Sequence, residues 1–226
     1  MSVMTQKVGQ RFRDADVLRM FPSFVWKATL RPDVCAPINE TLLRTLGEIG
    51  APLADLKPGD SWQSGQRLHE LEQFRDLVDC INAAAESVLD YLKIRYDGFA
   101  ITGCWANMSA PGAGHRAHSH PNNYLSGVYY VRTHPDANMI NFLDPRQQTA
   151  IIRPPVTALT AENTEQVVVQ VQDGTLLLFP AWLRHSVDAN RSGHLRFSLG
   201  FNIMFANYSE TMAQPLWLPG SRPSTA

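Results

Sequence analysis

The sequence has no apolar run of membrane length, no run of basic residues and no closely spaced pair of cysteines. A membrane-spanning helix needs about 20 mostly apolar residues in succession, so we expect no membrane segment. The net charge is −1 and basic residues do not cluster in the sequence, so a nucleic-acid partner is not expected either. The N-terminal residues are polar and charged, without the apolar centre of a secretory signal, which predicts a cytoplasmic protein.

The three cysteines, Cys35, Cys80 and Cys104, are scattered and odd in number. They are typical of reduced, mostly buried thiols and do not indicate a disulfide framework or a zinc site. With 226 residues, 44% of them hydrophobic and 18% charged, the chain is expected to fold as one globular domain spanning residues 1–226. No internal repeat or interdomain linker divides it.

The first part of the chain, residues 15–97, is predicted to supply a strand and supporting helices. Residues 15–30 mix β-branched and aromatic residues around Pro22, which favours an edge strand or a strand pair. Apolar residues recur at spacings of three and four in residues 39–49, with Asn39 as a candidate cap, and in residues 68–96. Both stretches are predicted to be helical.

The second part, residues 99–205, changes to short β-type runs separated by turn residues. These runs are residues 99–108, 124–131, 139–144, 150–154, 165–171, 174–180 and 196–205. Strands at this density, with little helix between them, indicate an antiparallel sandwich or barrel with the helices packed outside.

The first candidate metal ligands of this β region are two histidines separated by one residue. Alternate side chains of a strand point to the same side, so His118 and His120 can face one point, where imidazoles suit Fe, Zn, Cu or Ni. Pro121 follows and places the pair near a barrel rim. Such a pair also occurs on exposed strands that bind nothing, so a third ligand is needed. His185 is a candidate, because a buried strand and a rigid bend precede it.

Residues 196–203 alternate strictly, with one apolar face and one face that carries Arg196 and Ser198. If the apolar face joins the core, this arginine projects into the barrel, where burial is costly without an anion. Its partner is either a protein carboxylate or a carboxylate ligand held in a bidentate grip with help from the Ser198 hydroxyl. By the same parity, only one of Tyr129 and Tyr130 can face the cavity.

The ordered motifs H-x-H-P, LSGVYYV, FP-x-W-x-x-H and R-x-S resemble those of the non-haem Fe(II)/2-oxoglutarate-dependent oxygenases, in particular a group of small bacterial members. The resemblance extends from Trp105 to about Phe205. It implies a double-stranded β-helix, the cupin-like jelly-roll, with flanking helices. It also implies Fe(II), 2-oxoglutarate and O₂ as cofactor and cosubstrates, and release of succinate and CO₂ as a substrate is hydroxylated.

Within that resemblance, His118 and His185 match the family's two histidine ligands. Arg196 and Ser198 match the pair that binds the far carboxylate of 2-oxoglutarate. Tyr130 matches a tyrosine that assists there, and Asn107 lies where a residue near the other end of the cosubstrate is found.

The chain departs from the broad family at His120, which stands where an aspartate or glutamate is expected. Either His120 is the third metal ligand, which we favour from the spacing, or a carboxylate from elsewhere completes the site, with Asp144 as the candidate. As a turn former before Pro145, Asp144 also has an ordinary structural explanation. His115, Asn122, Asn123 and Trp182 are the candidate substrate contacts.

The leading hypothesis is an Fe(II)/2-oxoglutarate oxygenase that hydroxylates an unactivated C–H bond of a small molecule. One alternative is a three-histidine dioxygenase that needs no keto acid. Another is a catalytically silent jelly-roll that binds a metal or a small ligand. The helices within residues 39–95 are predicted to pack on the barrel or to form part of a homodimer surface.

Overall fold

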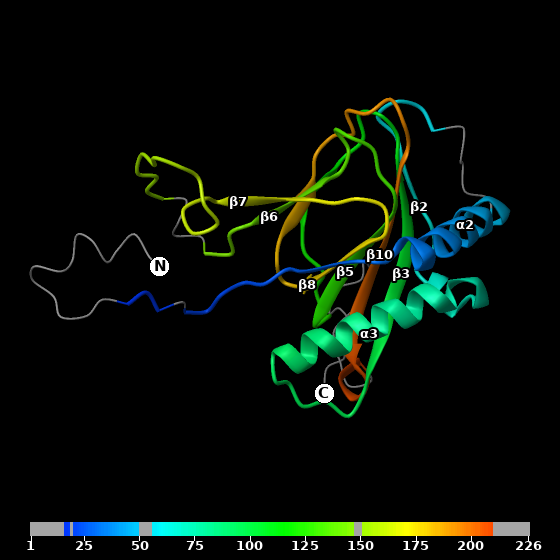
Figure 1. Cartoon of the computed structure of the whole chain (residues 1–226), viewed down its shortest axis with the longest axis horizontal. Coiled ribbons are helices and arrows are strands. Elements are labelled where there is room, and N and C mark those ends of the chain that lie inside the picture. The colour runs from blue at the N-terminus through cyan, green and yellow to red at the C-terminus, as the bar shows by residue number, and fades with distance from the viewer. Residues whose placement is uncertain (1–15, 19, 50–55, 147–150, 210–226) are drawn as a thin grey trace, which may run out of the picture.

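The computed structural model describes residues 16–18, 20–49, 56–146 and 151–209 (Figure 1). The strands are β1 (Trp26–Thr29), β2 (Ser61–Gln63), β3 (Phe99–Ser109), β4 (His115–His118), β5 (Leu125–Arg132), β6 (Met139–Leu143), β7 (Gln166–Gln170), β8 (Thr175–Pro180), β9 (His185–Val187) and β10 (Arg196–Phe205). The helices are α2 (Pro32–Glu48), α3 (Arg75–Tyr91) and the short α4 (Ala206–Ser209), with 3-10 turns η1 (Leu68–Glu70) and η2 (Glu72–Phe74). In this described part, no helix is long and apolar enough to cross a membrane.

The strands form two antiparallel sheets. The larger sheet has the order β1-β8-β5-β10-β3-β2, and the smaller has the order β4-β9-β6-β7. The predicted mainly β fold with flanking helices is therefore confirmed. The edge strand expected within residues 15–30 is β1, which pairs with β8. Six of the seven predicted β runs correspond to strands β3, β5, β6, β7, β8 and β10.

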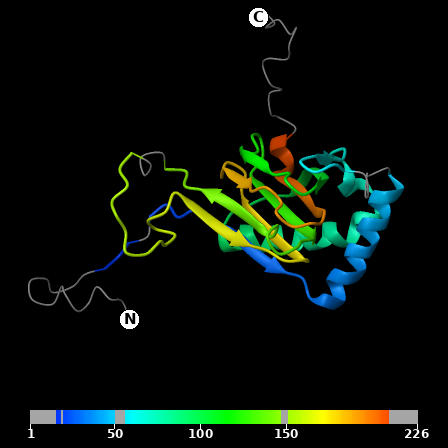
Figure 2. The ribbon, with the colours of Figure 1, turned by 90° about the horizontal axis from the view of Figure 1, so that it is seen from above.

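Helices α2 and α3 pack on the outer face of the larger sheet (Figures 1 and 2). The core between them contains Leu42 and Leu46 of α2, Ile81 of α3, and Tyr129 of β5, all at most 1% exposed. Full burial of one such aliphatic side chain stabilises a fold by about 1.5–3 kcal/mol. A second apolar cluster lies between the two sheets and includes Phe142 and Phe179. The smaller sheet thus packs against the other face of the larger one.

Two helix predictions need correction. Helix α2 begins at Pro32, because a proline in the first turn has its fixed φ already suited to a helix and lacks only an N–H that would be unpaired there. Asn39 therefore lies inside the helix and is not its cap. Its side chain instead donates to the Val131 carbonyl (2.8 Å) and accepts from the Tyr129 hydroxyl (2.7 Å). The long helix expected at 68–96 divides into η1, η2 and α3.

The predicted strand at 150–154 is wrong for the residues that are described. Residues 151–154 form no strand and are exposed, and Pro154-Pro155 cannot donate to a ladder; residue 150 lies outside the described residues. Strand β2, of three residues, was not predicted. Strands β4 and β9 lie outside the seven runs, at the positions where His118 and His185 were expected to lie on strands. The division into segments 15–97 and 99–205 and the dimer surface stay predictions.

Candidate metal centre

Three histidines converge at the smaller sheet. Strands β4 and β9 pair so that His118 lies opposite His185. His120 follows the end of β4, where its backbone N–H donates to the Ala181 carbonyl at 2.9 Å. One nitrogen from each of the three imidazoles lies within 4.8 Å of the other two. This is the separation at which three side chains can share one metal ion.

The hydrogen bonds of two of these rings leave their other nitrogens available. His118 Nδ1 is 2.8 Å from the Arg116 carbonyl, and His185 Nδ1 is 3.0 Å from the Leu183 carbonyl. A carbonyl only accepts, so each Nδ1 carries the proton and each Nε2 keeps its lone pair. Fixing a tautomer in this way is typical of metal-binding histidines. The Nε2 atoms of His120 and His185 are 3.4 Å apart.

Burial keeps two of the rings neutral. Desolvation lowers the pKa of His185 to about 4, although the hydrogen bond to Leu183 opposes the shift. Desolvation, with a contribution from the nearby His118, lowers the pKa of His120 to about 4 as well. Neutral imidazole is the form that binds a metal, so the pair is ready for a cation at neutral pH.

The histidines open into a cavity of about 300 Å³ between the sheets. The polar face predicted for residues 196–203 of β10 lines this cavity. Several residues that pair with this face on the adjacent strands β3 and β5 line it as well. Ser198 lies between Asn107 of β3 and Tyr130 of β5. Asn107, Tyr130, Arg196 and Ser198 all line the cavity, as does His115. Tyr129 joins the core on the opposite face, as strand parity predicts.

Arg196 is 3% exposed and has no carboxylate partner among the described residues. Its guanidinium donates to Ser109 Oγ at 3.2 Å and to the Ala137 carbonyl at 3.5 Å. Burial lowers the pKa of this arginine, a sign that the protein alone compensates its charge poorly. Of the two partners predicted for Arg196, the described part of the chain supplies no carboxylate.

The Tyr130 hydroxyl is a second buried polar group without a hydrogen-bond partner in the described chain. Burial raises the pKa of this phenol, while the charge of Arg196 opposes the shift, so the two groups lie close together. An unpaired buried hydroxyl costs free energy. A guanidinium without a carboxylate partner in the described chain and an unpaired hydroxyl fit the carboxylate of a keto acid. The three imidazoles fit a divalent transition metal.

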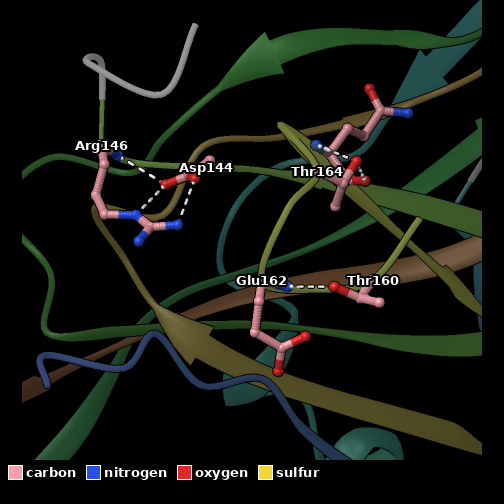
Figure 3. Close-up of polar contacts among 6 residues, drawn as sticks. Asp144, Arg146, Thr160, Glu162 and Thr164 are labelled. Carbon is pink, nitrogen blue, oxygen red and sulfur yellow. Dashed lines mark hydrogen bonds and ion pairs between the residues drawn. The ribbon is translucent and has the colours of Figure 1, made fainter. Parts of the chain in front are cut away.

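Asp144 is not part of the histidine group. Its carboxylate accepts hydrogen bonds from the backbone N–H of Arg146 at 2.9 Å and from the guanidinium of the same residue at 2.8 and 3.0 Å (Figure 3). The aspartate is therefore engaged in the turn after β6, as its position before Pro145 suggested.

Three of the predicted substrate contacts do not line the cavity, namely Asn122, Asn123 and Trp182. Asn123 Oδ1 accepts from the Thr102 hydroxyl at 2.5 Å, and Trp182 is 56% exposed. Conversely, sequence analysis missed Gln63 and Gln66, which do line it. Both lie in a stretch of Gly, Pro and Ser that gave no strand signal. The pairing of β2 with β3 places Gln63, and a hydrogen bond from the Cys104 N–H to the Gln66 carbonyl (2.8 Å) places Gln66. A larger hollow of about 500 Å³ beside α2 contains none of the residues proposed for the site.

Comparisons with known proteins agree with this geometry. Residues 103–202 match the model of a family described as "Putative 2OG-Fe(II) oxygenase". A search of the curated proteins gave no match. Among solved structures, the carbocyclase SnoK of nogalamycin biosynthesis, a non-heme alpha-ketoglutarate-dependent enzyme, superposes with a TM-score of 0.60 at 13% identity, covering 81% of this chain and 80% of its own.

A Pseudomonas putida prolyl-4-hydroxylase superposes with a TM-score of 0.54 at 17% identity, over 81% of this chain and 93% of its own. HygX from Streptomyces hygroscopicus, solved with nickel and 2-oxoglutarate, gives 0.55 at 12% identity, over 81% and 83%. HygX has also been solved with iron and, separately, with hygromycin B beside nickel and 2-oxoglutarate. At such low identity the superpositions show a shared fold, which is the double-stranded β-helix. The shared fold, together with the family match over residues 103–202, makes this chain similar to the 2OG-Fe(II) oxygenases.

Proposed function

We propose that this protein uses Fe(II), 2-oxoglutarate and O₂ to hydroxylate an unactivated C–H bond of a small molecule, releasing succinate and CO₂. One observation carries the proposal: a histidine triad lines the same cavity as a buried arginine that has no carboxylate partner in the described part of the chain. Hygromycin B bound to the HygX relative supports a small-molecule substrate. We expect such a substrate to enter from the cavity mouth.

In this proposal, His118, His120 and His185 hold the iron. The two bonds from Nδ1 to backbone carbonyls orient His118 and His185, so that little reorganisation accompanies metal binding. When bound, the iron and the keto acid together supply the oxidising chemistry. The protein contributes the three imidazole ligands, a fixed geometry and a cavity that also contains Arg196.

Arg196 would hold the far carboxylate of 2-oxoglutarate, with Ser198 and the Tyr130 hydroxyl completing the grip. Asn107, opposite Ser198 on β3, would contact the same molecule nearer its other end. A guanidinium gives two parallel N–H bonds to a carboxylate, which fixes the orientation of the cosubstrate as well as its position. His115 also lines this region, and the positive charge of Arg196 adds to burial in lowering its pKa, so its ring stays neutral beside the grip.

A three-histidine dioxygenase without a keto acid is the second candidate, because the triad contains no carboxylate. The buried Arg196 argues against it, since such an enzyme would leave this charge without a partner. A catalytically silent metal-binding jelly-roll is the third. Both alternatives predict that 2-oxoglutarate does not bind beside the metal.

Anaerobic titration of the Fe(II)-loaded protein with 2-oxoglutarate tests the proposal. We expect the weak visible charge-transfer band of a keto acid chelated to Fe(II). Removing one partner of a buried charged pair costs about 2–5 kcal/mol, so Arg196→Ala should weaken 2-oxoglutarate binding by at least ~30-fold. Arg44→Ala is the matched control, because Arg44 is 61% exposed and pairs with Glu48 on the surface of α2.

A wild-type protein that binds Fe(II) but gives no band would refute the keto-acid assignment and favour one of the alternatives. An unchanged affinity for 2-oxoglutarate in Arg196→Ala would contradict the role of this residue. Succinate release in air, measured with and without Arg196, then separates oxygenase turnover from a silent binding protein.

A further inference from the structure

Charge is confined to one end of the cavity. Arg196 is the only permanently charged side chain among the described residues that line it, and these include no lysine, aspartate or glutamate. With Arg196 paired to the keto acid, a charged group of a second ligand would lie in this cavity without a counter-ion, which is unfavourable. The part of a substrate that enters this cavity should carry no charge.

The cavity extends well beyond the space that a keto acid needs. Its lining follows β10 from Arg196 through Ser198 and Gly200 to Asn202. A strand rises about 3.4 Å per residue, so Arg196 and Asn202 are roughly 20 Å apart along the strand. A five-carbon keto acid held at Arg196 is shorter than this span, so the Asn202 end remains available to a second ligand.

Side-chain amides surround that second end. Asn202 Oδ1 accepts from the Ser126 hydroxyl at 2.7 Å, and its Nδ2 has no hydrogen bond within the described residues. Gln66 lies beside Gly103, the residue that pairs with Asn202. A Cβ atom added at Gly103 would be 3.7 Å from Gln66 Oε1. Gln63 lies nearer the Arg196 end, because it pairs with Asn107, the partner of Ser198. The side chains of Gln63 and Gln66 likewise make no hydrogen bond with the described chain.

Trp105 lies between these amides and close to the metal centre. Its indole packs against the backbone of Gly200, where a Cβ atom would come within 2.7 Å of the ring. The centres of the Trp105 and His120 rings are 5.8 Å apart. The glycine thus makes room for a flat apolar surface that reaches from Asn202 towards the proposed iron site. We call Gln66, Trp105 and Asn202 the amide wall.

We propose that the amide wall binds an uncharged, hydroxyl-bearing ring of the prime substrate, of the kind found in sugars and cyclitols. Each amide offers both a donor and an acceptor, which matches hydroxyl groups that also do both. The indole offers an apolar surface to the C–H face of such a ring. A cavity of about 300 Å³ is at the lower end for ligand clefts, so charged groups of a larger substrate lie outside it. The inference rests on the proposed function only in assigning the Arg196 end to the keto acid.

Ligand-observed saturation-transfer NMR on the full-length, metal-free protein tests this without any turnover. The probes are methyl β-glucopyranoside, glucuronate, glucosamine and acetylprolinamide. We expect methyl β-glucopyranoside to bind, with saturation strongest on its ring C–H protons. Glucosamine, and glucuronate tested with 2-oxoglutarate present to occupy Arg196, should bind at least ~10-fold more weakly, because their charges then find no partner.

Variants of the wall give the matched comparison. Gln66→Ala and Asn202→Ala should each weaken glucoside binding about 3- to 10-fold, as expected for one lost hydrogen bond. Gln172→Ala, an exposed glutamine outside the cavity, should change nothing. Gly200→Ala should reduce binding more strongly, because the new methyl group displaces Trp105. Thermal melting checks that each variant is folded, and Trp105→Phe replaces Gly200→Ala if that variant is not.

The charge-transfer band with Fe(II) and 2-oxoglutarate separates the two proposals. A protein with the band that binds charged sugars as well as the glucoside, or binds only acetylprolinamide, or binds no probe, overturns the amide-wall inference. A protein without the band that still binds the glucoside through Gln66 and Asn202 supports the inference and overturns the proposed function.

Discussion

The hydroxyl of Tyr130 allows a prediction in which one substitution has opposite effects in two states. In the described chain this hydroxyl is buried without a partner, and burial of an unpaired hydroxyl costs about 1–3 kcal/mol. Tyr130→Phe should therefore stabilise the metal-free protein by up to that amount. For a chain of this length, each kcal/mol corresponds to a rise in melting temperature of about 2–4 °C.

With 2-oxoglutarate bound the sign reverses. A hydrogen bond to a charged group contributes about 1.5–3 kcal/mol, so Tyr130→Phe should bind the keto acid about 10- to 150-fold more weakly. Differential scanning calorimetry of the metal-free protein measures the first effect. Anaerobic titration of the Fe(II)-loaded protein, followed by the charge-transfer band, measures the second.

Tyr129→Phe is the matched control, because Tyr129 lies next in sequence but on the other face of β5. Its hydroxyl donates to Asn39 Oδ1 at 2.7 Å, so its removal should lower stability by about 1 kcal/mol and leave keto-acid affinity unchanged. If Tyr130→Phe instead loses stability as Tyr129→Phe does, the Tyr130 hydroxyl has a partner within the folded protein. The proposed carboxylate grip would then lose one of its three members.

Three further predictions concern the iron site, the core thiol and the closest strand contact. His120→Ala should lose at least ~10-fold in Fe(II) affinity by equilibrium dialysis while Asp144→Ala keeps it, and the reverse result would make Asp144 the ligand. Burial raises the pKa of the Cys104 thiol from 9.0 to about 12, so the unfolded chain loses this proton first and stability falls as the pH rises above 9. The slope is at most about 1.4 kcal/mol per pH unit, and alkaline denaturation of Cys104→Ala should be correspondingly shallower. Gly127→Ala would place a methyl group 2.5 Å from the Leu177 carbonyl and should lower the free energy of unfolding by about 1–3 kcal/mol, measured by urea titration.

Strand parity explains why much of the site could be predicted. The alternation of residues 196–203 places Arg196 and Ser198 on the face opposite Phe197 and Leu199, and the structure keeps both faces as predicted. The same period of two separated Tyr130 from Tyr129. These predictions succeeded because the side-chain direction in a strand depends on local backbone geometry alone.

His120 shows where local geometry was insufficient. We expected it to share a strand with His118, but β4 ends at His118 and His120 lies beyond it. Its ring reaches the site because its backbone N–H binds the Ala181 carbonyl, a contact across 61 positions of sequence (181 − 120). Residue spacing alone cannot predict such a long-range contact. The convergence of His120 with His118 and His185 was therefore predicted correctly, but from strand spacing and without the backbone contact that produces it.

The sequence by itself determined the β-rich class, the two faces of β10 and the set of histidines and arginine from which a metal and keto-acid site can be built. These features follow from side-chain chemistry and the period of a strand. Only the tertiary structure decided that Gln63 and Gln66 join the cavity, and that Arg196 is buried without a carboxylate partner among the described residues. Each depends on which distant segments pack together, and that is set by the burial of the whole core.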